Sequence, residues 1–178
     1  MRHEWLIPAA GIALVAPYAQ IARSAEYSSV DAAQKSAFPG AVAFEPVVIG
    51  ADVKAAVARE AGRFPVDPRV WRVRDAERLQ GWFIVDEVIG RTELITYALA
   101  LDGEGAIRSL EILAYRESHG DAIRLPAWRG QFTGKRASDP VRLDADIRNV
   151  SGATLSCRHV TEGVRRILLV HARALARG

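Results

Sequence analysis

Apolar residues concentrate in three segments in the middle of the chain, and this pattern predicts a sheet. We expect strands over residues 81–89, 93–101 and 106–114, where apolar and β-branched side chains dominate and the last segment alternates with a period of two. Residues 102–105 (DGEG) separate the second and third segments, and their glycines favour the positive φ angles of a hairpin turn. The three segments therefore predict an antiparallel meander.

Helical signals flank these strands on both sides. Ser29 is a suitable N-cap for a helix over residues 29–37, and residues 53–61 predict a second helix. Apolar side chains recur at three- and four-residue spacing over residues 158–173, which predicts a terminal helix. Shorter strands are expected at 42–49 and 70–73, and irregular backbone at 115–134 and 144–156.

These elements predict one α+β domain over residues 26–178, in which central antiparallel strands are flanked by helices and the last helix follows a loop. Residues 1–25 have a different character. A short charged start is followed by an apolar run over residues 6–16 and by small residues, which indicates a secretory signal peptide or N-terminal anchor. The run is shorter than the about 20 apolar residues that span a bilayer. A buried N-terminal helix is the alternative.

The composition of the chain argues against several classes of function. The chain has 178 residues, of which 49% are hydrophobic and 25% charged, as expected for one globular domain. The net charge is +3 and the basic residues are scattered among acidic ones, so we do not expect nucleic-acid binding. Cys157 is the single cysteine, which excludes disulfides and cysteine-rich metal sites, and we predict no metal.

The segment before the terminal helix carries the candidate chemistry. Ser151, Gly152, Ala153 and Thr154 are small residues that let a ligand approach the backbone, and free amides at a helix start favour a phosphate there. Thr154 adds a hydroxyl group. The same residues are also typical of a simple helix cap, with Thr154 or Ser156 as the capping residue.

Residues 151–156 (SGATLS) resemble the flavinylation signature of FMN-binding domains. That family includes the periplasmic flavin subunits of Rnf complexes and of the sodium-pumping NADH:quinone oxidoreductase. Its signature threonine is esterified to the FMN phosphate by a dedicated flavin transferase. The resemblance implies that Thr154 carries FMN covalently, with Ser151, Gly152, Ala153 and Ser156 around the attachment point.

Other segments resemble the family in the same order along the chain. Glu117, Ser118, His119 and Gly120 are similar to its Glu-Thr-Pro-Gly segment. Residues 128–135 (WRGQFTGK) are similar to its Gln-Phe-x-Gly-Lys element, and residues 81–82 open a strand as in the family. Three such matches in order are fairly specific, and the resemblance extends over about residues 27–172.

One position departs from the family pattern. Many members carry aspartate three residues before the motif serine, where this chain has Arg148, and the nearest acid is Asp146. If that acid helps the transferase to recognise its target, modification is slow or absent and FMN binds noncovalently.

The resemblance also implies roles for residues outside the signature. Glu117 and His119 are candidates to tune the flavin, Trp128 and Phe132 are candidate apolar or stacking surfaces, and Arg158 is a candidate phosphate ligand. Core packing is an equal alternative for the two aromatic residues. The predicted cofactor-binding residues are Thr154, Ser151, Gly152, Ala153, Ser156, Glu117, Ser118, His119, Gly120, Trp128, Phe132 and Arg158.

The resulting hypothesis is an exported electron-transfer flavoprotein at a bacterial membrane surface, in the periplasm, and anchored to the inner membrane if its leader is retained. Its expected partners are a flavin transferase and membrane redox proteins, and no residue has a catalytic role of its own. The alternative is a noncatalytic exported binding or structural module in which residues 151–156 only cap a helix. A hydrolase is less favoured because Ser156 and His159 lack a Gly-x-Ser-x-Gly turn and an orienting aspartate.

Overall fold

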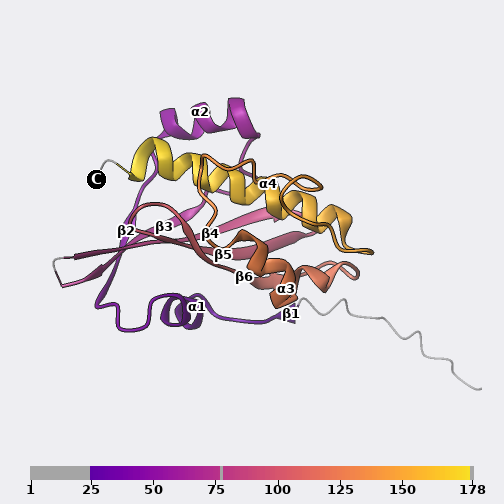
Figure 1. The fold of residues 1–178 in the computed structure, drawn as a ribbon, viewed down its shortest axis with the longest axis horizontal. Helices are drawn as coiled ribbons and strands as arrows, with labels where there is room; N and C mark the ends of the chain where they lie inside the picture. The colour runs from indigo at the N-terminus through magenta and orange to yellow at the C-terminus, as the bar shows by residue number, and fades with distance from the viewer. Residues whose placement is uncertain (1–24, 77, 177–178) are drawn as a thin grey trace, which may run out of the picture.

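A six-stranded antiparallel sheet forms the centre of the molecule, in the order β1-β6-β5-β4-β3-β2 (Figure 1). The computed structural model describes residues 25–76 and 78–176. The strands are β1 (Ala25–Glu26), β2 (Ala43–Val47), β3 (Arg69–Asp75), β4 (Arg78–Ile89), β5 (Leu94–Asp102) and β6 (Ile107–Tyr115). The predicted α+β class, the single domain and the antiparallel meander are confirmed.

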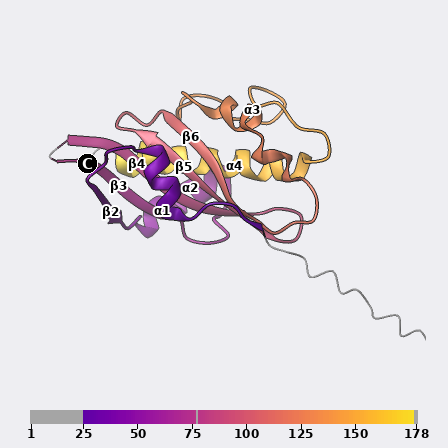
Figure 2. The ribbon, with the colours of Figure 1, turned by 90° about the horizontal axis from the view of Figure 1, so that it is seen from below.

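Helices cover both faces of the sheet. The C-terminal helix α4 (Thr154–Val170) lies along one face with α2 (Ala51–Ala61) beside it, and α1 (Val30–Ala37) lies on the opposite face (Figures 1 and 2). Each helical layer closes its own apolar cluster against the sheet. The larger cluster lies under α4, which fixes that helix relative to the ends of the strands.

The packing of α4 follows from its apolar stripe. Val160, Val164, Ile167 and Leu168 are at most 1% exposed, and each such side chain contributes about 1.5–3 kcal/mol on burial. Gly163 lets the helix approach closely, because a Cβ atom there would lie 2.5 Å from the Tyr97 hydroxyl oxygen. The helix is therefore held rigidly against β4 and β5.

The β5–β6 hairpin has the predicted turn chemistry. The Asp102 carboxylate accepts hydrogen bonds from the amides of Glu104 (2.9 Å) and Ala106 (2.8 Å), and Gly105 has a φ of +84°. Gly81 marks a close approach at the start of β4, since an added Cβ atom would lie 2.0 Å from the Leu101 carbonyl oxygen.

Several predicted boundaries are wrong. The last helix begins at Thr154, so residues 154–156 are helical and not part of the preceding loop. Its first turn buries few apolar side chains, and the periodicity therefore becomes visible only later. After α4 the chain continues as a π-helical turn, His171–Leu175, and the short β1 was not predicted.

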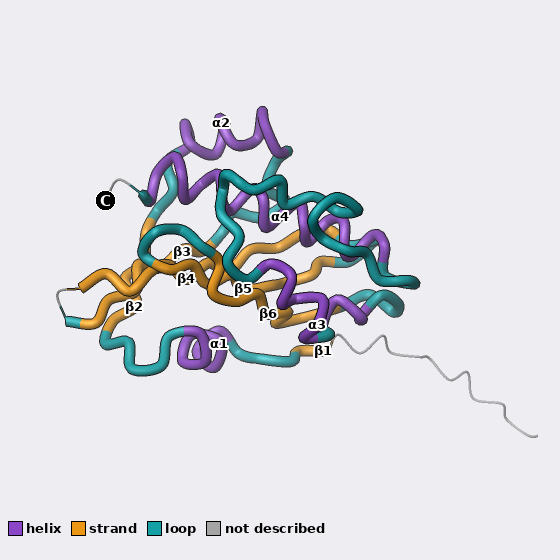
Figure 3. The backbone as a smooth tube through the Cα atoms, in the orientation of Figure 1, coloured by secondary structure: helices purple, strands orange, loops and turns teal. Residues whose placement is uncertain are grey.

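The segment predicted to be irregular after β6 contains three short helical turns. They are Asp121–Arg124, α3 (Pro126–Arg129) and Gly130–Phe132, and they lie together beside the N-terminal end of α4 (Figure 3). Such turns are too short to produce a periodic pattern in the sequence.

The predicted signal peptide or anchor, residues 1–25, lies outside the described residues except for its last one. Among the helices that the structure describes, none is both long enough and apolar enough to cross a membrane.

Candidate functional site

The N-terminus of α4 presents an exposed hydroxyl group. Ala153 is the N-cap residue and makes no side-chain capping bond, while Thr154 is the first helical residue and is exposed. The prediction that Thr154 or Ser156 caps the helix is therefore wrong. The Thr154 Oγ1 atom accepts a 3.1 Å hydrogen bond from Asn149 Nδ2. Among the described residues the first-turn amides thus have no side-chain acceptor, which leaves the partial positive charge of the helix start available to an anion.

Ser156 points inward instead and joins α4 to the end of β6. Its Oγ atom lies 2.9 Å from the Tyr115 hydroxyl oxygen, and that hydroxyl donates to the His119 carbonyl oxygen. In this arrangement the Ser156 hydroxyl donates to Tyr115. The chain of hydrogen bonds connects the helix, the last strand and the segment after it.

Gly120 makes the contact between the two family-like segments possible. Its φ is +94°, and an added Cβ atom would lie 2.7 Å from the Tyr115 hydroxyl and 2.9 Å from Ser156 Oγ. The same atom would lie 3.5 Å from Ala153 Cα. The structure therefore brings residues 117–120 against residues 153–156, as one site requires.

Glu117 fastens the β4–β5 turn to this site. Its carboxylate accepts hydrogen bonds from the amides of Thr92 (2.6 Å) and Glu93 (2.9 Å). Burial alone would raise the pKa of Glu117, but these backbone donors outweigh burial and lower it. His159 ties the same turn to α4 through a 2.9 Å contact between Nδ1 and the Gly90 carbonyl oxygen. These bonds give Glu117 a backbone-ordering role.

A cavity of about 530 Å³ adjoins the loop that precedes Thr154. Its volume is in the range of about 300–1,000 Å³ that is usual for small-molecule sites. Apolar and polar side chains from the helical turns after β6 and from the loop before α4 form its walls. They are Leu125, Ala127, Trp128, Gln131, Asp146, Arg148 and Val150.

The two aromatic candidates differ in their access to this cavity. Trp128 lines it, and its Nε1 atom donates a 3.0 Å hydrogen bond to the Arg148 carbonyl oxygen. Phe132 is 0% exposed and packs edge-on against Trp128, with the ring centroids 5.1 Å apart. The structure places Phe132 in the core, where it supports Trp128 from behind.

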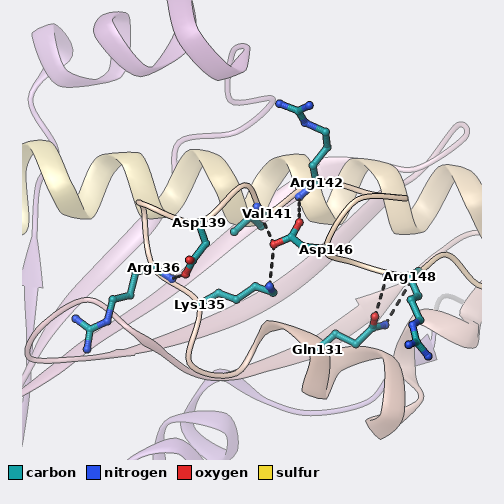
Figure 4. Close-up of polar contacts among 8 residues, drawn as sticks. All are labelled: Gln131, Lys135, Arg136, Asp139, Val141, Arg142, Asp146 and Arg148. Carbon is teal, nitrogen blue, oxygen red and sulfur yellow. Dashed lines mark hydrogen bonds and ion pairs between the residues drawn. The ribbon is translucent and has the colours of Figure 1, made fainter.

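Arg148 is held by its backbone at the wall of the cavity. Gln131 accepts from the Arg148 amide at 2.8 Å and donates to its carbonyl oxygen at 3.4 Å (Figure 4). Together with the bond from Trp128, these contacts fix the main chain of Arg148 on both sides. The arginine that replaces the family aspartate therefore lies at the candidate ligand site.

Asp146 has a different task in the same loop. Its carboxylate accepts hydrogen bonds from Lys135 Nζ (2.7 Å) and from the amides of Arg142 (2.7 Å) and Val141 (3.2 Å) (Figure 4). Burial raises the pKa of Asp146, but these donors, led by Lys135, hold it below its usual value. Asp146, the acid nearest to Arg148, thus orders the loop before α4.

The remaining predicted residues fall into two groups. Ser151, Gly152, Ser118 and His119 are exposed or nearly so beside the cluster, and the His119 ring is 3.2 Å from Ser118 Oγ. Arg158 is exposed and lines a second cavity. Burial raises the pKa of the Cys157 thiol, as an unreactive cysteine requires.

Sequence reasoning did not single out Tyr115, Asn149 or Gln131 as site residues. Gln131 lies inside residues 128–135 and Asn149 lies two residues before residues 151–156, so proximity to those motifs was an available signal. Tyr115 ends β6, and its link to Ser156 depends on tertiary structure that has no local sequence pattern.

Comparison with known proteins agrees with this geometry. The family model of the FMN-binding domain matches residues 90–169. This part of the chain is therefore similar to an FMN-binding domain. The matched range includes residues 117–120, 128–135 and 151–156, whereas residues 81–82 lie before it. The match supports a module that binds FMN.

A solved structure also resembles this chain. The crystal structure of Shewanella oneidensis NqrC matches with a TM-score of 0.47 and 19% sequence identity, over 78% of this chain and 70% of that chain. No curated protein matches the chain.

Proposed function

We propose that the protein is an exported electron-transfer flavoprotein whose FMN is bound through a phosphoester to Thr154. The observation that carries the proposal is the exposed Thr154 hydroxyl at the uncapped start of α4, four residues after Val150, which lines a cavity of about 530 Å³. The isoalloxazine supplies the redox chemistry when FMN is bound, and the protein supplies attachment, orientation and electrostatics.

The residues at the helix start fit a phosphate group. Free amides of the first turn favour the negative charge of the phosphoester. Asn149 donates to the Thr154 oxygen, which orients the hydroxyl without consuming its proton. Attachment replaces that hydrogen with the FMN phosphoryl group, so the protein gains one FMN less one water.

The walls of the cavity fit a ring that is apolar on its faces and polar at its edges. Leu125, Trp128 and Val150 provide apolar surface, and Gln131 and Arg148 provide polar groups. Arg148 contributes positive charge where many family members have negative charge. It would favour a reduced, anionic flavin over the neutral oxidised form.

Export and membrane location complete the proposal. The charged and apolar pattern of residues 1–25 favours export, and covalent attachment would prevent loss of the cofactor outside the cytoplasm. The partners that fit this location are a flavin transferase and membrane redox proteins. The competing cap-only module loses support because neither Thr154 nor Ser156 caps the helix.

The test is intact-mass analysis after co-expression with an active flavin transferase. We expect a mass increase of one FMN less one water in the wild type and in Ser151→Ala, whose exposed hydroxyl lies three residues earlier. Thr154→Ala should show no increase. An unchanged increase in Thr154→Ala would move the attachment site elsewhere, and absence of any bound flavin in the wild type would refute the proposal.

Noncovalent FMN has its own signature. In that case the wild type is yellow after mild purification but loses the colour and the added mass on denaturation. Export is tested by cell fractionation of the full chain and of a variant that lacks residues 1–25. Equal cytoplasmic retention of both would contradict export.

A further inference from the structure

Another cavity, of about 280 Å³, lies along α4 beyond the loop that precedes Thr154. Arginines from two different segments line it, Arg142 from the loop and Arg158 and Arg165 from the helix. Val141, Leu143 and Thr161 form most of the remaining wall. The cavity therefore combines a cationic rim with a largely apolar floor.

The three arginines have no counter-ion within the part of the chain that the structure describes. None forms a hydrogen bond or ion pair through its guanidinium there. Glu162 also lines the cavity, four residues after Arg158 and three before Arg165, but it pairs with neither. Three positive charges thus face one negative charge across a small space.

The loop holds Arg142 in place. The Val141 backbone has a φ of +39°, which is unfavourable for a β-branched residue. The Asp146 carboxylate stabilises this turn by accepting hydrogen bonds from the amides of Val141 and Arg142. Lys135 Nζ donates a further hydrogen bond to Asp146 and holds it in place (Figure 4). The backbone that presents Arg142 is therefore ordered before any ligand binds, which lowers the entropic cost of binding.

We propose that Arg142, Arg158 and Arg165 form a phosphate-binding site that is separate from the flavin-attachment site. Guanidinium groups match phosphate oxygens in pairs of parallel hydrogen bonds and are more weakly hydrated than ammonium groups. The apolar floor formed by Val141 and Leu143 suits the organic part of a phosphate ester. The ligand is a phosphate ester, either a soluble monoester or the headgroup of an anionic phospholipid.

The experiment compares the full-length, flavin-free chain with charge-removing variants. The double variant Arg142→Gln/Arg165→Gln removes two rim charges and leaves Arg158, which lies closest to Thr154, intact. Arg59→Gln removes one charge from an exposed position on α2 and is the control. Circular dichroism establishes that all variants fold, and since the rim charges repel one another the double variant should be at least as stable as the wild type.

Two binding measurements distinguish the sources of phosphate. Calorimetric titration with glycerol phosphate reports a soluble ester. Co-sedimentation with vesicles of phosphatidylglycerol in phosphatidylcholine, minus binding to phosphatidylcholine alone, reports a lipid headgroup and cancels any contribution of the apolar N-terminus. We expect the double variant to weaken at least one of these by tenfold or more and Arg59→Gln to weaken neither by more than twofold.

Three outcomes would overturn the proposal. One is that the wild type binds neither probe. Another is that Arg59→Gln weakens binding as much per charge removed as the double variant does, which would indicate diffuse surface charge. The third is that flavinylated protein loses the binding seen without flavin, because the cavity would then hold the cofactor's own phosphate. The first two results are obtained without flavin and therefore do not depend on whether Thr154 is the attachment residue.

Discussion

The two ends of α4 serve opposite purposes in this molecule. Beyond Val160 the helix is embedded, with its apolar stripe against the sheet and α2 beside it. At its start Thr154 and Leu155 are exposed, and the neighbouring backbone comes from loops and short helical turns. Packing fixes the position of the helix at one end, and the other end presents an exposed hydroxyl group.

Two aspartates show how differently the ends handle charge. Asp86 is 1% exposed under α4, and burial raises its pKa to about 6 although Tyr97 donates a 2.6 Å hydrogen bond. The second carboxylate oxygen of Asp86 and Nε of Arg166 have no hydrogen-bond partner among the described residues. Asp146, with three donors, has a lowered pKa. Burial determines the charge state at the packed end, and hydrogen bonds determine it at the loop end.

The largest expected effect is truncation of the packed half of α4. Ile167→Ala removes a side chain that is 1% exposed, and the lost burial and remaining cavity should cost about 3–4 kcal/mol of unfolding free energy. Leu155→Ala, at a position 44% exposed near the helix start, should cost less than about 1 kcal/mol. Urea unfolding of both variants measures the difference. Equal losses would mean that the two ends are packed alike.

The second prediction concerns Asp86 and pH. Its pKa is about 6 in the folded protein against 3.8 in the reference state, so the folded protein binds the extra proton between these values. Stability from this group is complete below pH 3.8 and is lost as the pH rises through 6. The difference between these two pKa values corresponds to about 3 kcal/mol. Asp86→Asn should remove this decline, as urea unfolding at several pH values would show. If the unfolding free energy of Asp86→Asn declined with pH as steeply as that of the wild type, the prediction would be wrong.

The packed half is also where sequence patterns predicted most. Apolar residues at three- and four-residue spacing indicated α4, and two apolar segments around a DGEG turn, the second of them alternating, indicated the β5–β6 hairpin. These signals are strong because burial on one face forces the period of the helix or strand on the sequence. The start of α4 was misplaced for the same reason, since its exposed first turn is under no such constraint.

The candidate site was predicted only through resemblance. Small residues at 151–154 indicated a helix start, but the residues alone did not distinguish an attachment site from a cap. Tyr115 meets the site through a tertiary contact that leaves no local pattern. Phe132 shows that a resemblance can also mislead. It lies in a segment that resembles the family, but its side chain is buried in the core.

Removing the charge of Asp146 tests whether the loop end depends on hydrogen bonds. Asp146→Asn replaces a carboxylate that accepts three bonds by an amide that cannot accept all of them, and about 2 kcal/mol should be lost at pH 7. Because the pKa of Asp146 is lowered on folding, its stabilising effect is present above pH 3.8 and disappears as the pH falls further. Asp144→Asn is the control, since asparagine tolerates the φ of +61° there. A loss as large in Asp144→Asn would contradict the assignment.

The smallest effect should come from the hydrogen bond that joins the two family-like segments. Tyr115→Phe removes the hydroxyl that binds both Ser156 Oγ and the His119 carbonyl, at a cost of about 1 kcal/mol. Ser156→Ala removes only the first of these bonds. In a double-mutant cycle measured by urea unfolding, the two losses should be less than additive, because each variant eliminates the same contact. Strict additivity would mean that the segments are held together by the close approach at Gly120 alone, and that the loop end of α4, like its packed end, is positioned by shape and not by hydrogen bonds.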